Sequence, residues 1–94
     1  MARTVLAPHP RLAARLIDGR ALILDPHTEE LRRLNETGSF IWDLIARRQS
    51  DRQALLDALL AEFEVDAATA SADLDALLDS FEREALVIEI TRRD

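Results

Sequence analysis

The stretch that decides the fold is Leu31–Leu44, with the sequence LRRLNETGSFIWDL. Its first four residues read as a short extended run, and Asn35 follows at a predicted helix start because an Asn side chain can accept from the free N–H groups of a first turn. Glu36 adds negative charge there, where the helix dipole favours it. An apolar helix stripe then recurs at spacings of three and four, made of Phe40, Ile41, Leu44 and Ile45. The stretch therefore joins a predicted β region to a predicted α region.

The residues before this junction predict an antiparallel meander. Arg11–Ile17 and Arg20–Leu24 have strand-like patterns, and the Asp18-Gly19 pair between them is a strong signal for a tight hairpin. Asp25–Thr28 has turn chemistry, with Pro fixing one φ and Asp able to bond its own backbone. Glu29–Leu34 is then the third strand. We expect Met1–Pro10, which lacks periodicity, to be a loose entry segment.

The residues after the junction predict three helices. The first covers about Glu36 to Arg48, and Gly38 in its first turn suggests a close backbone approach. Ser50 with Gln53 three residues later predicts a capping box for the second helix. Asp66 is the predicted N-cap of the third, whose apolar stripe is Ala70, Leu74, Leu77, Leu78 and Phe81.

The end of the sequence predicts a short final strand over Leu86–Ile90 and a frayed tail over Thr91–Asp94. The order of elements indicates an α+β fold like a winged helix-turn-helix, with a three-stranded antiparallel sheet followed by a three-helix bundle. Its 94 residues predict one domain over 1–94, with a core over about 10–90. We interpret Trp42, which lies off the main stripe, as closing the core, with partial exposure at a partner surface as the alternative.

The composition narrows the function classes. A content of 48% hydrophobic and 32% charged residues is typical of a folded, soluble chain. The absence of Cys removes disulfides and thiolate chemistry, and we find no apolar run of membrane-spanning or signal-peptide length. We therefore expect a cytoplasmic protein with no membrane partner. The net charge of −6 argues against a nucleic-acid partner, because phosphate binding needs a concentrated basic surface.

The sequence shows no catalytic or metal-binding motif. His9 and His27 lie 18 positions apart, each next to a proline, and we interpret both as exposed loop residues. Two glycines in the whole chain leave no room for a glycine-rich phosphate loop, and every serine fits a cap or helix position. We predict no catalytic residues, no metal and no cofactor, and thus a protein that is not an enzyme.

The segment ILDPHTEELRRLNETGSFIWDLI resembles the PqqD family, the small proteins of pyrroloquinoline quinone biosynthesis and their relatives. The resemblance lies in Leu34-Asn35, the small residue Gly38 and Ile41-Trp42, and it extends over roughly Pro10 to Glu89. It implies a stand-alone RiPP recognition element, which holds the leader of a ribosomally made precursor peptide for a modifying enzyme. The founding members carry an Arg-rich first strand with a leading Gly, which this sequence lacks. We therefore give a lasso-peptide pathway at least the same weight as quinone-cofactor biosynthesis.

The resemblance implies a binding groove between the third strand and the third helix. If Glu29–Leu34 is an edge strand, its free backbone can pair with an added strand. The expected peptide-binding residues are Glu29, Glu30, Leu31, Arg32, Arg33, Leu34, Ala70, Asp73, Leu74 and Leu77.

The implied partners are a precursor leader peptide and a processing enzyme, either a radical S-adenosylmethionine enzyme or a leader peptidase. We leave open whether the protein also forms a homodimer. Two alternatives from other classes remain: a winged-helix DNA-binding protein, and a small dimerisation or adaptor domain. The acidic character of the predicted third helix speaks against the first, because DNA phosphates would repel it.

Overall fold

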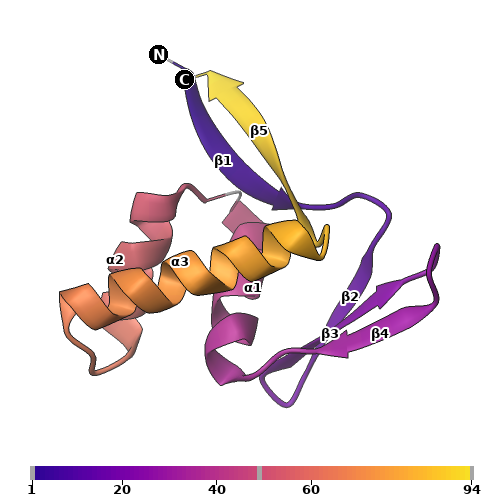
Figure 1. Cartoon of the computed structure of the whole chain (residues 1–94), viewed down its shortest axis with the longest axis horizontal. Helices are drawn as coiled ribbons and strands as arrows, with labels where there is room; N and C mark the ends of the chain where they lie inside the picture. The colour runs from indigo at the N-terminus through magenta and orange to yellow at the C-terminus, as the bar shows by residue number, and fades with distance from the viewer. Residues whose placement is uncertain (1, 49, 94) are drawn as a thin grey trace.

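The computed structural model describes residues 2–48 and 50–93. The chain forms a three-stranded sheet, a separate two-stranded ribbon and three helices, and Figure 1 shows the helices below the ribbon and to the left of the sheet. The elements in chain order are β1 (Ala2–Pro8), β2 (Ala13–Ile17), β3 (Arg20–Asp25), β4 (Glu30–Arg33), α1 (Glu36–Arg48), α2 (Arg52–Glu62), α3 (Ala67–Arg83) and β5 (Val87–Arg93). The α+β architecture with an antiparallel sheet and three helices confirms the predicted fold class.

The three-stranded sheet has the order β2-β3-β4 and is antiparallel throughout, as the meander predicts. Asp18 and Gly19 both have positive φ, 52° and 77°, which is the conformation that a two-residue hairpin turn requires. The predicted strand bounds were too wide in two places. Arg11 and Leu12 precede β2, while Glu29, at a φ of 61°, belongs to the turn before β4. Leu34 follows the end of β4.

The predictions for the two outer segments were wrong. Ala2–Pro8 is a strand, not a loose entry, and it pairs antiparallel with β5 from Ala2↔Arg93 to Pro8↔Val87. The predicted tail over Thr91–Arg93 is part of β5, which begins one residue later than expected; Asp94 lies outside the described residues. The physical reason is burial: Val5, Leu6 and Ala7 are at most 7% exposed, so β1 contributes core surface that needs a paired backbone.

The helices begin and end for identifiable reasons. The N–H of Gly38 donates to the Asn35 side chain at 2.7 Å, which confirms the predicted cap of α1. The predicted capping box of α2 was wrong, because Asp51 rather than Ser50 is the N-cap and accepts from the N–H of Ala54 at 2.8 Å. Asp66 caps α3 as predicted, accepting from the N–H of Thr69 at 2.8 Å.

The end of α3 has a Schellman motif. The N–H of Ala85 donates to the Glu82 carbonyl at 3.1 Å, and the N–H of Leu86 donates to the Phe81 carbonyl at 2.9 Å. Ala85 adopts a φ of 57°, a conformation that usually selects glycine. The reversal at Ala85 sends the chain from α3 directly into β5.

The hydrophobic core surrounds α1. Ile41 and Ile45 have no exposed surface and pack among residues from both sheets and the other helices. Trp42 is 2% exposed and meets Phe81 edge to face at a centroid distance of 5.9 Å, so its core interpretation is confirmed and its partner-surface alternative is wrong. The buried Ser39 hydroxyl accepts from the N–H of Ala21 at 2.8 Å, which fixes β3 against α1.

Candidate functional site

The free edge of β4 is the first component of the site. Within the described residues β4 pairs only with β3, so its other edge has no backbone partner. The N–H of Leu34 donates to the Ala21 carbonyl at 3.0 Å, which continues the β3–β4 register by one step. Because hydrogen-bonding direction alternates along an antiparallel strand, Arg32 also faces β3, while the N–H and C=O groups of Leu31 and Arg33 point outward.

An apolar hollow of about 430 Å³ begins where β4 ends. It lies between the first turn of α1 and the exposed side of α3. A Cβ at Gly38 would lie 3.0 Å from the Asn35 cap oxygen, which is unusually tight, whereas the Leu77 side chain of α3, at 3.7 Å, would be in ordinary contact. The close approach suggested by that glycine therefore concerns the cap of its own helix rather than the distance between the helices. The hollow is lined by Asn35, Thr37, Gly38, Leu59, Asp73, Leu74, Ala76 and Leu77.

An ion pair joins β4 to the end of α3. A guanidinium nitrogen of Arg32 lies 2.6 Å from a carboxylate oxygen of Glu84, the C-cap residue of α3, and another lies 2.9 Å from Glu30. Arg32 pairs across the sheet with the buried Ile23, so it occupies the inner face, toward α3. Arg32 thus ties the strand to the end of α3, and Leu34 and Asn35, which follow the strand directly, lead to the apolar hollow.

The structure separates the predicted strand residues by face. Leu31 is 65% exposed and Arg33 is exposed, both on the outer face of the sheet opposite Leu24 and Leu22. Glu30 is exposed and bonds Arg32, and Glu29 lies in the preceding turn rather than on the strand. The structure thus links β4 to the end of α3 through the Arg32 side chain, with Leu34 as the link to α1.

The predicted α3 residues differ in accessibility. Asp73 is exposed and Leu77 is partly buried, and both line the apolar hollow. Leu74 also lines it but is 1% exposed, so it forms the floor. Ala70 is 1% exposed and packs inside the core, which leaves it without surface for a ligand. The predicted apolar stripe of α3 is thus confirmed, but Ala70 and Leu74, which we expected to contact a peptide, lie on its buried side.

Sequence reasoning missed Asn35, Thr37, Leu59 and Ala76 as lining residues of the hollow. The signal for Asn35 and Thr37 was available, since both flank Gly38, the residue already expected to permit close packing. Leu59 and Ala76 carried no such signal, because which side of α2 and α3 meets α1 depends on helix packing angles that periodicity does not give.

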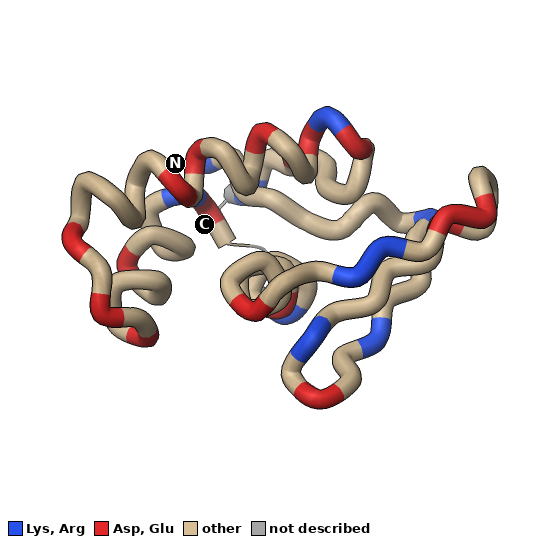
Figure 2. The backbone as a smooth tube through the Cα atoms, turned by 60° about the horizontal axis from the view of Figure 1, so that its bottom comes forward, with Lys and Arg blue, Asp and Glu red and all other residues tan. Residues whose placement is uncertain are grey.

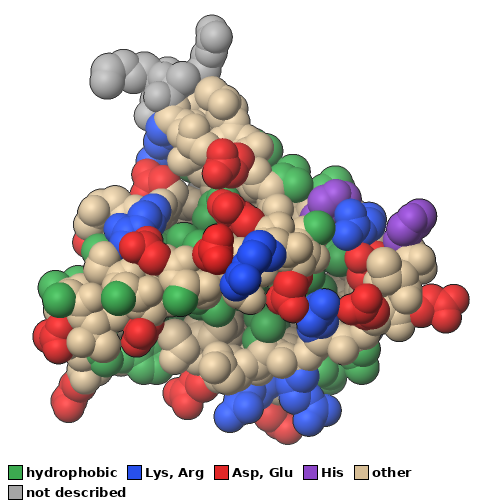
Figure 3. Space-filling model, in the orientation of Figure 1, with side chains coloured by type: hydrophobic (Ala, Val, Ile, Leu, Met, Phe, Trp, Pro, Cys, Tyr) green, Lys and Arg blue, Asp and Glu red, His purple; other side chains and the backbone are tan. Residues whose placement is uncertain are grey.

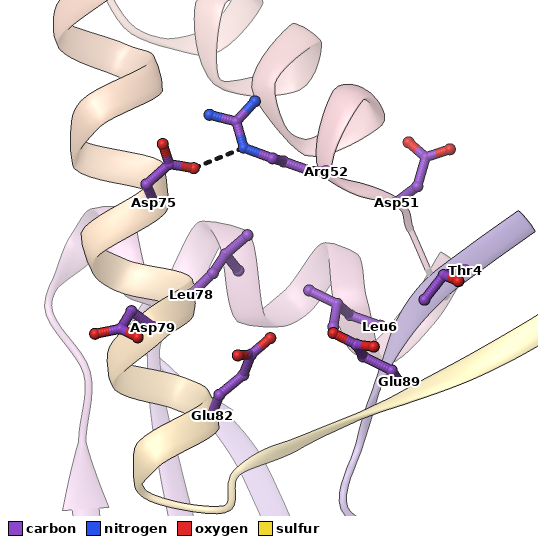
Figure 4. A pocket seen from close by; sticks show the side chains of 9 residues that line it. All are labelled: Thr4, Leu6, Asp51, Arg52, Asp75, Leu78, Asp79, Glu82 and Glu89. Carbon is purple, nitrogen blue, oxygen red and sulfur yellow. Dashed lines mark hydrogen bonds and ion pairs between the residues drawn. The ribbon is translucent and has the colours of Figure 1, made fainter.

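A second hollow of about 370 Å³ lies between α3 and the β1–β5 ribbon. Figure 4 shows Leu6 and Leu78 among acidic side chains, with Arg52 bonded to Asp75 across the gap. Figure 3 shows acidic side chains gathered over this side of α3, in contrast to the basic cluster at the foot of the molecule. This acidic hollow adjoins no free edge of the three-stranded sheet, so it does not share the backbone donors and acceptors of β4.

The Asp25 carboxylate has a structural role. Arg11 donates to Asp25 at 3.0 Å and, with the N–H of His27, holds the pKa of that largely buried carboxyl below its usual range. The prediction that His9 is exposed was wrong: it is partly buried and lies 2.9 Å from Arg11. His27 is exposed as expected.

The described residues offer neither a metal-binding cluster nor a membrane-spanning helix. Residues 2–48 and 50–93 contain no group of three or more His, Asp or Glu side chains that could hold a metal ion. None of the described helices is long and apolar enough to cross a membrane.

Comparisons with known proteins agree with this geometry. A family model described as coenzyme PQQ synthesis protein D (PqqD) matches residues 20–87, well over half of the chain. A solved structure described as "TbiB1 in Complex with the TbiA(beta) Leader Peptide" is 26% identical, with a TM-score of 0.80 over 86% of this chain and 93% of that one.

A second solved structure, "Lasso peptide synthetase B1 complexed with the leader peptide", shares the fold at 23% identity. Its TM-score is 0.77, and the match covers 88% of this chain and 96% of that one. A search of curated proteins finds no match.

Proposed function

We propose that this chain, which belongs to the PqqD family, is a RiPP recognition element that binds the leader of a ribosomally made precursor peptide by strand addition. The leader pairs with the outward backbone groups of Leu31 and Arg33 on β4. Its inward side chains face α3 and enter the apolar hollow at Leu77 and Asp73. The two solved structures described as leader-peptide complexes support this proposal by their similarity in fold.

The observation that carries the proposal is the free edge of β4 beside the hollow. Main-chain hydrogen bonds give a strand-adding peptide its affinity, and pockets for alternate side chains give specificity. The other free edge of the sheet, on β2, lacks this combination: in the described part of the chain, both hollows lined by β2 residues contain no helix residue. Of the two edges of the three-stranded sheet, β4 is thus the one that combines open backbone groups with a pocket on α3.

The charge distribution disfavours the DNA-binding alternative. In a winged helix-turn-helix protein α3 would enter the major groove. Here its exposed side carries Asp73, Asp75 and Asp79, and Figure 2 shows acidic residues spread along that helix while the basic residues cluster on the sheet. Phosphates would be repelled along the helix that must approach them most closely.

The protein acts, in this proposal, as a non-catalytic carrier in the cytoplasm. By holding the leader it raises the effective concentration of the precursor at a processing enzyme, either a radical S-adenosylmethionine enzyme or a leader peptidase. We propose that residues 1–94 act as a single peptide-binding domain. An open β4 edge can also pair with a second copy, so a homodimer competes with the leader for the same backbone groups.

The test is a binding titration with defined peptides. Fluorescein-labelled synthetic leaders from short precursor genes beside the gene for this chain are titrated with the protein, with the TbiA(beta) leader as a second probe and a labelled DNA duplex as the negative control. We expect saturable anisotropy change with a neighbouring leader and none with the duplex at moderate salt. Tight duplex binding without leader binding would refute the proposal.

A second measurement locates the bound peptide. Backbone amide hydrogen exchange is compared with and without the leader that binds. Slower exchange of the Leu31 and Arg33 amides, which face outward, is expected, whereas the Arg32 amide is already bonded within the sheet and should change little. Protection confined to the acidic hollow beside β1 and β5 would place the peptide elsewhere.

A further inference from the structure

The outer face of the sheet consists of two contrasting cross-strand rows next to the free edge. The register places Arg15, Leu22 and Arg33 side by side in one row, and Ala13, Leu24 and Leu31 in the next. A strand added beside β4 would extend both rows by one residue each, opposite Arg33 and opposite Leu31. These two residues of the added strand lie two positions apart, because side chains alternate between faces.

Arg33 differs from most arginines of this protein in having no acidic partner. Six described arginines form ion pairs within 4 Å: Arg3, Arg11, Arg32, Arg47, Arg52 and Arg83. Among the described side chains, Arg15, Arg20 and Arg33 make none, and all three lie on the outer face of the three-stranded sheet. In a chain of net charge −6, this face is left positively charged.

Leu31 is the counterpart in the apolar row. At 65% it is the most exposed of the large apolar side chains in the described part of the chain, and Leu24 beside it is 41% exposed. Together with Leu22 they line a shallow hollow on the outer face. An apolar residue placed directly opposite Leu31 would cover it, since directly opposed side chains on one face of a sheet have Cβ atoms roughly 5 Å apart.

We infer that the recognised leader carries an acidic residue opposite Arg33 and an apolar residue two positions away, opposite Leu31. This inference rests on the proposed strand addition and adds a specificity rule to it. It concerns the outer face of the added strand, whereas the hollow on α3 receives the side chains of the inner face. The leader is thereby selected on both faces, by charge and apolar contact outside and by fit to the pocket inside.

The same two rows oppose a homodimer through β4. β4 is only four residues long. An antiparallel pairing of two β4 edges therefore brings the Arg33 side chains of both copies onto one small area of the outer face. Like charges at such spacing destabilise a strand pair, while an acidic leader residue gains the opposite sign of the same interaction. The charge pattern therefore favours a peptide of complementary sequence over a second copy.

A charge-exchange experiment tests the rule. The leader that binds in the titration above is synthesised with each acidic residue replaced by Arg in turn, and each peptide is titrated against wild type, Arg33→Glu and Arg15→Glu. We expect Arg33→Glu to bind the parent leader roughly three- to tenfold more weakly than wild type does. One acid-to-Arg peptide should restore the lost affinity, and it should do so for Arg33→Glu and for neither of the other two proteins. Arg15→Glu, two strands from the edge, is the matched control and should show no such exchange.

A parallel scan tests the apolar position. The peptide residue two positions from the exchanging acid is replaced by Asp, and this peptide is titrated against wild type and Leu31→Ala. We expect the replacement to weaken binding to wild type and to matter much less with Leu31→Ala, which lacks the apolar side chain that the peptide residue covers. Raising the salt concentration should reduce the Arg33 effect and leave the Leu31 effect.

The outcomes separate the two proposals. If no leader binds, strand addition and the specificity rule both fail. If a leader binds and slows exchange of the Leu31 and Arg33 amides, yet no acid-to-Arg peptide recovers affinity for Arg33→Glu, the specificity rule alone is overturned. A rise in dimer content in Arg33→Ala, measured by light scattering, is the expected companion result, because this variant removes the like charge from both copies.

Discussion

Replacing Arg33 by proline isolates the backbone contribution to leader binding. The Arg33 N–H points away from β3, because the Leu34 N–H donates to Ala21 inside the sheet and the direction alternates. Proline at 33 therefore removes a donor from the free edge and leaves the β3–β4 ladder intact, a location where strands tolerate proline. At position 32 the same substitution removes a ladder bond to β3.

The expected losses of binding affinity and of folding stability therefore differ between positions 33 and 32. One lost intermolecular backbone bond is worth about 1 kcal/mol, so Arg33→Pro should bind about fivefold more weakly than Arg33→Ala, which removes the same charge but keeps the N–H. Its free energy of unfolding should match that of Arg33→Ala within about 0.5 kcal/mol. Arg32→Pro should instead lose at least about 1 kcal/mol of folding stability.

The assay is an anisotropy titration of each variant with the labelled leader, and urea denaturation followed by circular dichroism gives the unfolding free energies. Arg33→Ala is the reference for side-chain loss, and Arg32→Ala serves position 32 in the same way. If Arg33→Pro folds and binds as tightly as Arg33→Ala, the leader does not pair with the edge of β4 at this residue, and the strand-addition argument fails.

Other substitutions test the fold and the site separately. Leu74→Ala should destabilise the protein by about 2–5 kcal/mol in urea, because Leu74 is 1% exposed, whereas Leu31→Ala should leave unfolding within about 0.5 kcal/mol and weaken leader binding. Ala85→Gly should raise the thermal midpoint, with a gain of up to about 1 kcal/mol, since glycine relieves the positive φ of 57°. Stability should fall as the pH drops below the ordinary aspartate pKa of about 3.9, because Arg11 holds the pKa of Asp25 lower in the folded protein, and this dependence should flatten in Arg11→Gln.

The sequence predicted what local chemistry determines. The Asp18-Gly19 turn, the Asn35 and Asp66 caps and the bounds of α1 all follow from residues within a few positions of each other. The free edge of β4 was also predictable, because a meander of three strands leaves its last strand at an edge.

The remaining features depend on contacts between distant segments. The strand Ala2–Pro8 has little alternation, since Val5, Leu6 and Ala7 are all buried, and its partner lies about 80 residues away in the sequence. Period-based reading cannot detect such a strand. The contribution of Leu59 to the hollow likewise follows from how the helices cross, which single-helix periodicity leaves undetermined.

The pairing of β1 with β5 has a consequence for synthesis on the ribosome. Residues 2–8 emerge before the other described elements, yet their backbone partner, residues 87–93, is translated after all of them. The β2–β4 hairpins and the helices can form from neighbouring residues. β1 stays unpaired until β5 has been synthesised, and until then the apolar side chains of Val5, Leu6 and Ala7 are exposed to solvent. Contacts of such long sequence separation slow folding. The nascent chain therefore passes through a state with an unpaired apolar strand, the form in which chaperones and aggregation compete for it.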